Sequence, residues 1–299
     1  MGQRKIGILS PGDMGGGVGA ALTEHGHDVI TCVAGRSQET QARAERLGFR
    51  LAPDLDSLLA EADIVLSILP PEAAAGLARD VAAAMRRSGS APPYADCNAV
   101  SPETARAIGT LFEGTGSPFI DGGIVGPAPR PGVPPTRFYV SGEAAGLMDV
   151  LEGKGMSVRH VGPEIGRASA VKMCYASITK GTNTLHAAAM TVAEALGVGE
   201  TVRAEIDESL PAVMRHMRAT IPRLPADSGR WVGEMEEIAR TFASAGVTPR
   251  FHQGAAEMFR LLDSTPYGRE TRETMDAARS LEETVAACLR HLPMRDAAE

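Results

Sequence analysis

The sequence has few cysteines, and they are not arranged as a metal site or a disulfide framework. Its 299 residues include four, at Cys32, Cys97, Cys174 and Cys288, and no two of them form a CxxC pair. Such spacing argues against a zinc site and against a disulfide-stapled secreted domain. No histidine pair has the HExxH spacing of a zinc hydrolase either. We therefore expect no metal and a protein of the reducing cytoplasm.

Long hydrophobic runs and a clustered positive charge are also absent. No apolar stretch reaches membrane-spanning length, and the strand-like start MGQRKIGIL is too short for the apolar core of a signal peptide. The formal net charge is −7 and the basic residues are scattered, which argues against a phosphate-backbone partner. We expect neither a membrane nor a nucleic-acid partner, and a small-molecule substrate instead.

The first part of the chain alternates short β-branched runs with helical runs. KIGIL at Lys5–Leu9 is the first expected strand, and DVITCV at Asp28–Val33 closes a βαβ unit of about the expected ~30 residues. Repeated alternation of this kind predicts the α/β class, with a Rossmann-type, doubly wound, mainly parallel sheet over residues 1–165. The other elements expected there are helices over 38–47, 72–85, from 102 and over 143–151, and strands over 63–69, 94–97, 119–121 and 137–142.

Residues 166–197 are expected to join this domain to a second one. The run contains no proline and one interior glycine, which predicts a single helix, 167–196, of roughly 45 Å. Gly197 supplies its C-terminal stop. Downstream periodicity is helical throughout, so residues 166–299 are predicted to form an all-helical substrate or dimerisation domain. The helices expected there cover 201–217, kinked or split at Pro211, then 228–245, 248–262 and 269–292.

A glycine-rich turn follows the first strand and opens the first helix. Ser10, Gly12 and Gly15 occupy the positions of a GxGxxG motif, so a serine stands where the first glycine would be. Glycines in such a turn let the backbone approach a pyrophosphate, whose charge is met by N–H groups at the helix start. The strand–turn–helix context favours dinucleotide binding over an ordinary tight turn. The predicted cofactor-binding residues of this turn are Ser10, Pro11, Gly12, Asp13, Met14 and Gly15.

The end of the second strand bears on the choice of cofactor. An acid there would bond a ribose 2′-hydroxyl, but the sequence reads Ala34-Gly35-Arg36-Ser37. A guanidinium and a hydroxyl suit a 2′-phosphate, so Arg36 and Ser37 predict NADP(H) rather than NAD. A solvated loop arginine is the alternative interpretation.

Five motifs in order resemble the β-hydroxyacid dehydrogenase and 6-phosphogluconate dehydrogenase superfamily. They are GILSPGDMG (7–15), SILPP (67–71), DCNAVSP (96–102), IDGGIVGPAP (120–129) and GRASAVKMCYA (166–176). KMCYASITKG (172–181) and RWVGEMEEIA (230–239) resemble a less characterised branch, whose helical C-terminal domain has no assigned substrate. The resemblance implies NAD(P)-dependent hydride transfer and a helical second domain that usually dimerises, so a homodimer is expected.

The resemblance places the catalytic lysine of the family at Lys172. Hydride arriving at a carbonyl carbon leaves negative charge on oxygen, which a nearby ammonium can protonate. A lysine extended into solvent from the helix surface is the alternative. The family asparagine three residues later is Tyr175, which could donate a hydrogen bond to the same oxygen or could pack. Further predicted contacts are Leu69, Pro70 and Asn98 for the cofactor, and Gly122, Gly123, Asn98 and Lys172 for the substrate.

Two departures from the family pattern bear on the substrate. A serine that helps bind a substrate carboxylate aligns with Val125, and a glycine aligns with Pro127. We predict hydride transfer between NADPH and a small polar carbonyl or hydroxy compound. Imine reduction is the alternative within the same class, although imine-reducing relatives lack a lysine at this helix position. An NADPH-binding redox sensor with little turnover is the alternative from another class.

Overall fold

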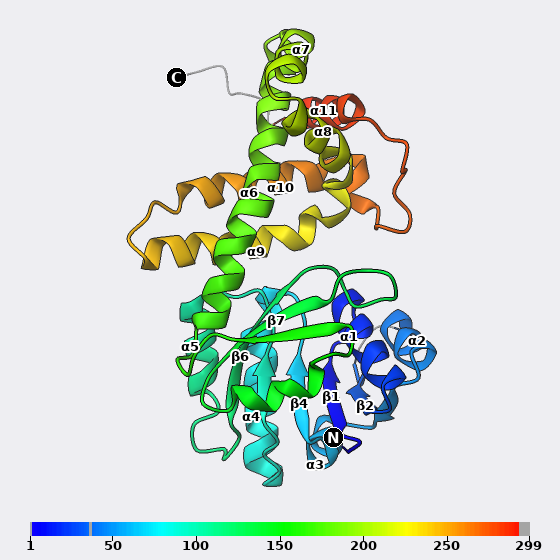
Figure 1. Cartoon of the computed structure of the whole chain (residues 1–299), viewed down its shortest axis with the longest axis vertical. Helices are drawn as coiled ribbons and strands as arrows, with labels where there is room; N and C mark the ends of the chain where they lie inside the picture. Colours follow the sequence, from blue (N-terminus) through cyan, green and yellow to red (C-terminus); the bar gives the residue numbers. More distant parts are fainter. Residues whose placement is uncertain (1, 36–37, 293–299) are drawn as a thin grey trace. The chain divides into compact units, whose positions relative to one another are not determined.

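The computed structural model describes residues 2–35 and 38–292, and the chain divides into two compact units. Unit 1 is Met1–Cys174 and unit 2 is Tyr175–Glu299. The boundary falls inside the long helix α6 (Arg167–Ala195), so the first two turns of this helix belong to unit 1 (Figure 1). Among the helices in the described ranges, none combines the length and the apolar character needed to cross a bilayer.

Unit 1 is built on one eight-stranded sheet. Its strands are β1 (Lys5–Leu9), β2 (Asp28–Cys32), β3 (Arg50–Ala52), β4 (Ile64–Ser67), β5 (Tyr94–Asp96), β6 (Phe119–Val125), β7 (Thr136–Ser141) and β8 (Met156–His160). They lie in the order β3-β2-β1-β4-β5-β6-β7-β8, with β1 to β6 parallel, β7 antiparallel to β6, and β8 parallel to β7. The first six strands have the order of a dinucleotide-binding sheet, whose winding reverses between β1 and β4. The predicted α/β fold class is confirmed.

Helices cover both faces of this sheet. On one face, α1 (Asp13–Glu24), α2 (Gln38–Arg46) and the 3₁₀ helix η1 (Ala145–Leu151) share an apolar core with alternate residues of β1, such as Ile6 and Ile8. On the other face, α3 (Leu55–Glu61), α4 (Pro71–Ser88) and α5 (Pro102–Thr110) pack on a second core. Because both faces are buried, the loops at the carboxyl edge of the parallel strands are where such a sheet binds ligands.

Two strands of the sheet were not predicted from the sequence. Strand β3 has three residues, of which two are exposed, and β8 is exposed at its last two residues. Neither strand has the continuous apolar run or the strict alternation on which a strand prediction depends. Their pairing with β2 and β7 therefore comes from tertiary contacts rather than from local pattern.

The regular structure of unit 2, over its described residues, consists of helices joined by loops. After α6 come α7 (Gly199–Ser209), α8 (Pro211–Thr220), the 3₁₀ turn η2 (Ile221–Arg223), α9 (Pro225–Ser244), α10 (Arg250–Ser264), the 3₁₀ turn η3 (Pro266–Arg269) and α11 (Leu281–Arg290). Pro211 splits the segment predicted as one kinked or split helix, because it occupies the first position of α8 and cannot continue α7. The apolar faces of α9 and α10 pack together, with Trp231 edge-on to Phe259 at 5.3 Å between ring centroids.

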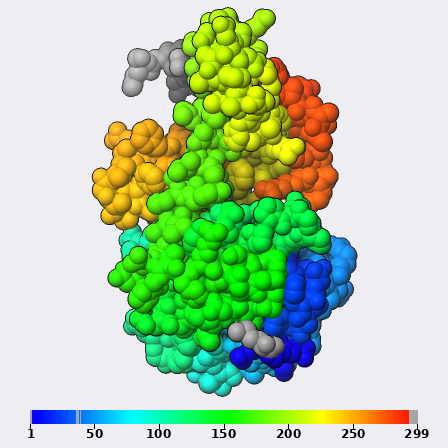
Figure 2. Space-filling model, in the orientation of Figure 1, coloured from blue at the N-terminus to red at the C-terminus, as the bar shows by residue number. Residues whose placement is uncertain are grey.

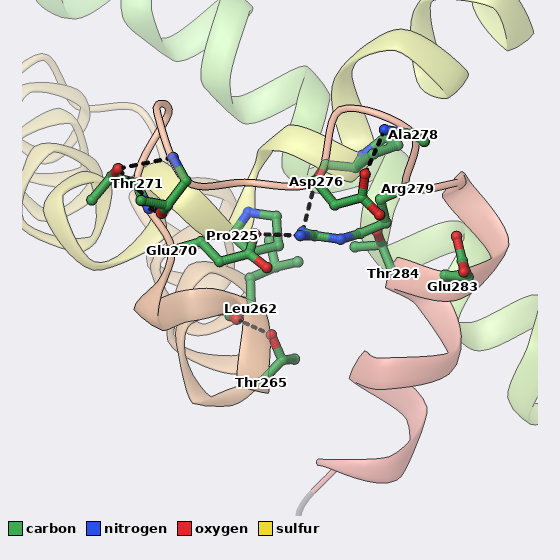
Figure 3. A network of polar contacts seen from close by, with 12 residues as sticks. Pro225, Leu262, Thr265, Glu270, Thr271, Asp276, Ala278, Arg279, Glu283 and Thr284 are labelled. Atoms are coloured by element: carbon green, nitrogen blue, oxygen red, sulfur yellow. Dashed lines mark hydrogen bonds and ion pairs between the residues drawn. The ribbon is translucent and has the colours of Figure 1, made fainter.

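The prediction of a last helix over residues 269–292 is wrong for residues 269–280. Helix α11 begins only at Leu281, where Ser280 and Glu283 form a capping box. Before it, the buried Arg279 donates to the Pro222 carbonyl at 3.2 Å and forms an ion pair with Glu270, as part of the network in Figure 3. These contacts hold residues 270–279 as a loop, although Met275 and Ala278 fit the helical spacing.

Candidate functional site

The turn between β1 and α1 has the conformation of a glycine turn. Among residues 2–35 and 38–292, Ser10 is the one non-glycine residue with positive φ, at 73°. The N–H of Gly12 donates to the Ser10 carbonyl at 2.9 Å and closes the turn. Ser10 therefore takes the left-handed conformation that the missing first glycine would adopt, which costs an L residue roughly 1 kcal/mol. Backbone strain of this kind is often kept at functional turns.

The two glycines that remain in the motif are required for different reasons. A Cβ at Gly15 would lie 2.5 Å from the Ser10 carbonyl oxygen, so the turn itself excludes any side chain there. A Cβ at Gly12 would meet nothing within 4 Å, and φ at Gly12 is −71°, which any residue can adopt. Nothing in the described chain therefore demands a glycine at position 12. The close approach of a ligand to the backbone would demand one.

The start of α1 is suited to an anion. Gly12 is the N-cap residue of α1 and has no side chain to accept from the first-turn N–H groups. These groups stand at the carboxyl edge of β1, beside the point where the winding of the sheet reverses. The residues present thus fit the pyrophosphate of a dinucleotide. The predicted 2′-phosphate contacts, Arg36 and Ser37, are in the gap between the two described ranges.

Asn98 joins the ends of β4 and β5. It is 2% exposed, its Oδ1 accepts from the Leu69 N–H at 2.7 Å, and its Nδ2 donates to Ser67 Oγ at 3.0 Å. Pro70 follows as the N-cap of α4. The structure thus brings the predicted residues Leu69, Pro70 and Asn98 together at the carboxyl edge of the sheet. Asn98 shapes this edge through two hydrogen bonds of its own.

A buried acid supports the same edge. Asp96 is 1% exposed, and its Oδ1 accepts from the Asn98 N–H at 3.0 Å, while its Oδ2 is buried without a hydrogen-bond partner. Burial raises the pKa of Asp96 to about 7, hydrogen bonds from Asn98 oppose the shift, and the charge of Asp121 adds to it. Asp96 therefore changes its protonation state near neutral pH.

The glycine pair of β6 is required by packing on two sides. A Cβ at Gly123 would lie 2.6 Å from the Ala168 carbonyl oxygen and 2.9 Å from Lys172 Cβ, and one at Gly122 would lie 2.8 Å from Cys97 Sγ. Gly123 thus allows the start of α6 to approach the strand. Both glycines pair with β7, and successive N–H groups of a strand point to opposite edges. At most one of them can therefore face a ligand on the β5 side.

Lys172 lies on the second turn of α6, partly buried, with its Cβ over Gly123. Because Asp96, the last residue of β5, pairs with Asp121, Gly123 extends past the end of β5. Lys172 therefore stands at the same carboxyl edge as the glycine turn, within unit 1. Tyr175, the other predicted catalytic residue, is the first residue of unit 2 and is 46% exposed. In the ranges that the structure describes, no group of three acidic, histidine or cysteine side chains is placed to hold a metal ion.

Comparisons with known proteins agree with this geometry. The family described as "NADP oxidoreductase coenzyme F420-dependent" matches residues 5–89, and a domain of unknown function, DUF1932, matches residues 193–262. The chain is 29% identical over 182 residues to an uncharacterised 28.5 kDa protein of Methanothermus fervidus, across 61% of this chain and 68% of that protein. A solved structure, conserved protein MTH1747, described as similar to 3-hydroxyacid dehydrogenases, has 29% identity and a TM-score of 0.63, over 87% of this chain and 96% of that one. The chain thus resembles the 3-hydroxyacid dehydrogenases in fold, with a helical C-terminal domain.

More distant structures share the fold. The 3-hydroxyisobutyrate dehydrogenase of Mycobacterium tuberculosis, solved with L-serine, has a TM-score of 0.68 at 21% identity, over 95% of this chain and 99% of that one. An imine reductase of Myxococcus stipitatus, solved with NADP⁺, has a TM-score of 0.53 at 20% identity, over 90% and 97%. The resemblance predicted from the sequence is confirmed, and unit 1 of this β-hydroxyacid dehydrogenase-like chain has the nucleotide-binding fold of an oxidoreductase.

Proposed function

We propose that this chain is an NADP(H)-dependent oxidoreductase that moves hydride between the nicotinamide and a small polar carbonyl or hydroxy compound in the cytoplasm. The observation that carries the proposal is the position of Lys172. Its helical turn is packed on Gly123 at the carboxyl edge of the sheet, where the glycine turn is suited to a dinucleotide. A nucleotide-binding module without chemistry has no need of a lysine based at that edge.

In the proposed reaction Lys172 moves the proton. Bound NADPH would supply hydride to the substrate carbon. The Lys172 ammonium donates a proton to the oxygen as negative charge develops on it, and the neutral amine takes that proton back in the reverse direction. Gly12 and the first N–H groups of α1 hold the pyrophosphate, and Asn98 keeps the ends of β4 and β5 in place.

A screen of compounds with NADPH or NADP⁺, followed by nicotinamide absorbance, tests the reaction class. The panel contains 3-hydroxy acids, including 3-hydroxyisobutyrate, with L-serine, their keto counterparts and preformed cyclic imines. We expect turnover with hydroxy or keto compounds. Turnover with imines alone would favour the second candidate, imine reduction, for which the imine reductase fold is the supporting observation. Tight NADPH binding without turnover of any class would favour the redox sensor.

The proposed preference for NADP(H) rests on Arg36 and Ser37, and on the description of the matching family. Arg36→Ala should lower the ratio of NADPH to NADH affinity by about 10- to 100-fold, because a charge-assisted contact to the 2′-phosphate is lost. Binding titrations with both nucleotides measure the ratio. Arg46→Ala, at the end of α2, is the matched control and should leave the ratio unchanged. An unchanged ratio in Arg36→Ala would exclude this phosphate contact.

We also propose that the protein is a homodimer through unit 2. Helices α6 and α10 line an open cavity of about 510 Å³ with small residues such as Gly181 and Ala255, and the green surface of α6 adjoins the orange surface of α10 in Figure 2. Large apolar side chains project beside it, with Leu185 67% and Phe251 74% exposed. Exposed apolar patches of this kind mark interaction surfaces, and a surface with both ridges and a groove can pair with its own copy.

The homodimer is tested by the mass in solution. Wild-type protein should have twice the mass of one chain by light scattering, and Phe251→Asp should shift it to one chain at low micromolar concentration. Leu147→Asp in η1, another exposed apolar position at 47%, is the control and should leave the mass unchanged. A monomeric wild type, or a Phe251→Asp variant that stays dimeric, would contradict the proposed surface.

A further inference from the structure

We propose that Asp121 is the positioning residue of the site, because its carboxylate holds the first turn of α6 and thereby aims Lys172. The inference rests on the proposed function, in which Lys172 moves the proton. Asp121 is the third residue of β6 and is completely buried. It falls in the IDGG motif, where the sequence directed attention to the glycines and gave the acid no role.

Five hydrogen bonds converge on the Asp121 carboxylate. Its Oδ2 accepts from the backbone N–H groups of Gly166 at 2.9 Å, Ala168 at 3.0 Å and Ser169 at 3.2 Å, and from Ser141 Oγ at 2.8 Å. Its Oδ1 accepts from Ser169 Oγ at 2.6 Å. Every partner donates, so both carboxylate oxygens act here as acceptors.

The start of α6 has no cap of its own that could replace this one. The helix begins at Arg167 after Gly166, which has no side chain and a φ of 100°. The N–H groups of the first turn of a helix lack partners within the helix, and the turn carries the positive end of its dipole. Asp121 meets both needs from 45 to 48 residues away in the chain.

Strand β6 and the start of α6 contact each other at a second point. Gly123 lies two residues after Asp121 and so on the same face of the strand, and Lys172 lies one helical turn after Ala168. A Cβ at Gly123 would strike both the Ala168 carbonyl oxygen and Lys172 Cβ. The carboxylate thus holds the helix end while Gly123 sets how closely the next turn approaches. Together these contacts resist rotation of α6 and fix the direction in which the Lys172 side chain leaves it.

Comparison with Asp96 shows that burial alone does not make an acid of this sheet the cap of α6. Asp96 pairs directly with Asp121 across β5 and β6, so both side chains lie on one face of the sheet. Asp96 accepts a hydrogen bond at Oδ1 from the Asn98 N–H, and its buried Oδ2 has no hydrogen-bond partner. Two adjacent buried carboxylates repel each other, and the five donors are gathered around Asp121.

The first test measures the helix start without any substrate. Hydrogen exchange of the 166–174 segment is followed in the full-length wild-type protein and in Asp121→Asn. Asparagine keeps the shape of the side chain, but its NH₂ group replaces one acceptor oxygen and faces the hydrogen-bond donors around it. We expect exchange of this segment to accelerate by roughly 10- to 100-fold, with β1 unchanged, as the loss of a charge-assisted hydrogen bond predicts. Ser280→Ala removes the cap of α11 and is the control, with no change at 166–174. Unchanged exchange in Asp121→Asn would overturn the inference.

The second test separates positioning from a general structural effect. Asp121→Asn should lower kcat at least tenfold at constant NADPH affinity, and should cause no further loss when Lys172 is already methionine. The substrate is the hydroxy or keto compound found in the absorbance screen, with 3-hydroxyisobutyrate as the first probe. An equal loss in the Lys172→Met background would overturn the positioning role. Should Asp121→Asn fail to fold, Ser169→Ala, which removes one of the five bonds, should give smaller changes of the same sign, and wild-type behaviour would overturn it.

The two proposals fail in different ways. If Lys172→Met keeps full turnover, the proposed proton transfer by Lys172 is wrong, and the exchange experiment still reports whether Asp121 holds the helix. If Lys172→Met abolishes turnover while Asp121→Asn retains wild-type kcat, the proposed reaction stands and the positioning role is excluded.

Discussion

Replacing Lys172 with methionine is expected to lower kcat by about 10²- to 10⁴-fold, the range by which a positioned acid or base contributes to proton transfer. Methionine keeps an unbranched stem over Gly123 but removes the ammonium, so the packing of α6 on β6 should survive. The dissociation constant for NADPH should stay within about twofold, because the residues proposed to bind the pyrophosphate are in the β1–α1 turn. Steady-state rates and a fluorescence titration of NADPH measure the two quantities.

The control for this variant is Lys5→Met. Lys5 begins β1, at the edge of the sheet opposite to the glycine turn, and its ion pair with Glu61 is half exposed. A surface pair of this kind contributes little, so both rate and affinity should match the wild type. Wild-type turnover in Lys172→Met would remove the residue from the mechanism, and reduced NADPH affinity of the same size would show that it binds the cofactor instead.

The parts of the fold that could be predicted are those specified by local sequence. A strand, a glycine turn and a helix follow one another within residues 5–24, and the strand and the helix each have their own periodicity, so the βαβ unit and its glycine turn could both be predicted. The long helix was predicted for the same reason, and its bounds, Arg167–Ala195, lie within a residue of the expected 167–196.

The parts that could not be predicted depend on contacts between distant segments. Strand β3 is held by its pairing with β2, and residues 270–279 stay out of a helix because Arg279 binds Glu270 and the Pro222 carbonyl. Asp121 belongs with these, since a helix cap supplied from another strand leaves no signature near the helix start. Capping rules examine the residues next to a helix, and there the sequence offers only Gly166.

The DGG segment of β6, residues 121–123, contains two residues that were predicted as site residues and one that was not. Side chains alternate along a strand, so Asp121 and Gly123 face α6 while Gly122 faces the Cys97 side. From the sequence, the two glycines were predicted to contact the substrate. Packing explains both glycines without a ligand, and the acid beside them makes the polar contacts. In such a strand, a missing side chain can mark where a helix comes close rather than where a substrate binds.

Alanine substitutions at the two glycines of the β1–α1 turn are expected to affect different properties, NADPH affinity at Gly12 and stability at Gly15. Gly12→Ala should leave the free energy of unfolding unchanged, since the new methyl meets nothing within 4 Å. It should weaken NADPH binding by roughly 10- to 100-fold, because the methyl would occupy the place proposed for the pyrophosphate and break its charge-assisted contacts to the helix start. Gly15→Ala should lower stability by about 1–3 kcal/mol even without nucleotide, because its Cβ overlaps the Ser10 carbonyl.

Thermal unfolding without nucleotide and an NADPH titration, made on the same preparations, distinguish these outcomes. Gly76→Ala in α4 is the matched control, since its Cβ also enters open space, and a position inside a helix favours alanine over glycine by up to about 1 kcal/mol. It should be slightly more stable than the wild type and bind NADPH equally well. Wild-type affinity in Gly12→Ala would mean that the pyrophosphate does not pass over this turn. The glycine at position 12 would then need another explanation, and the cofactor site would have to be sought elsewhere in unit 1.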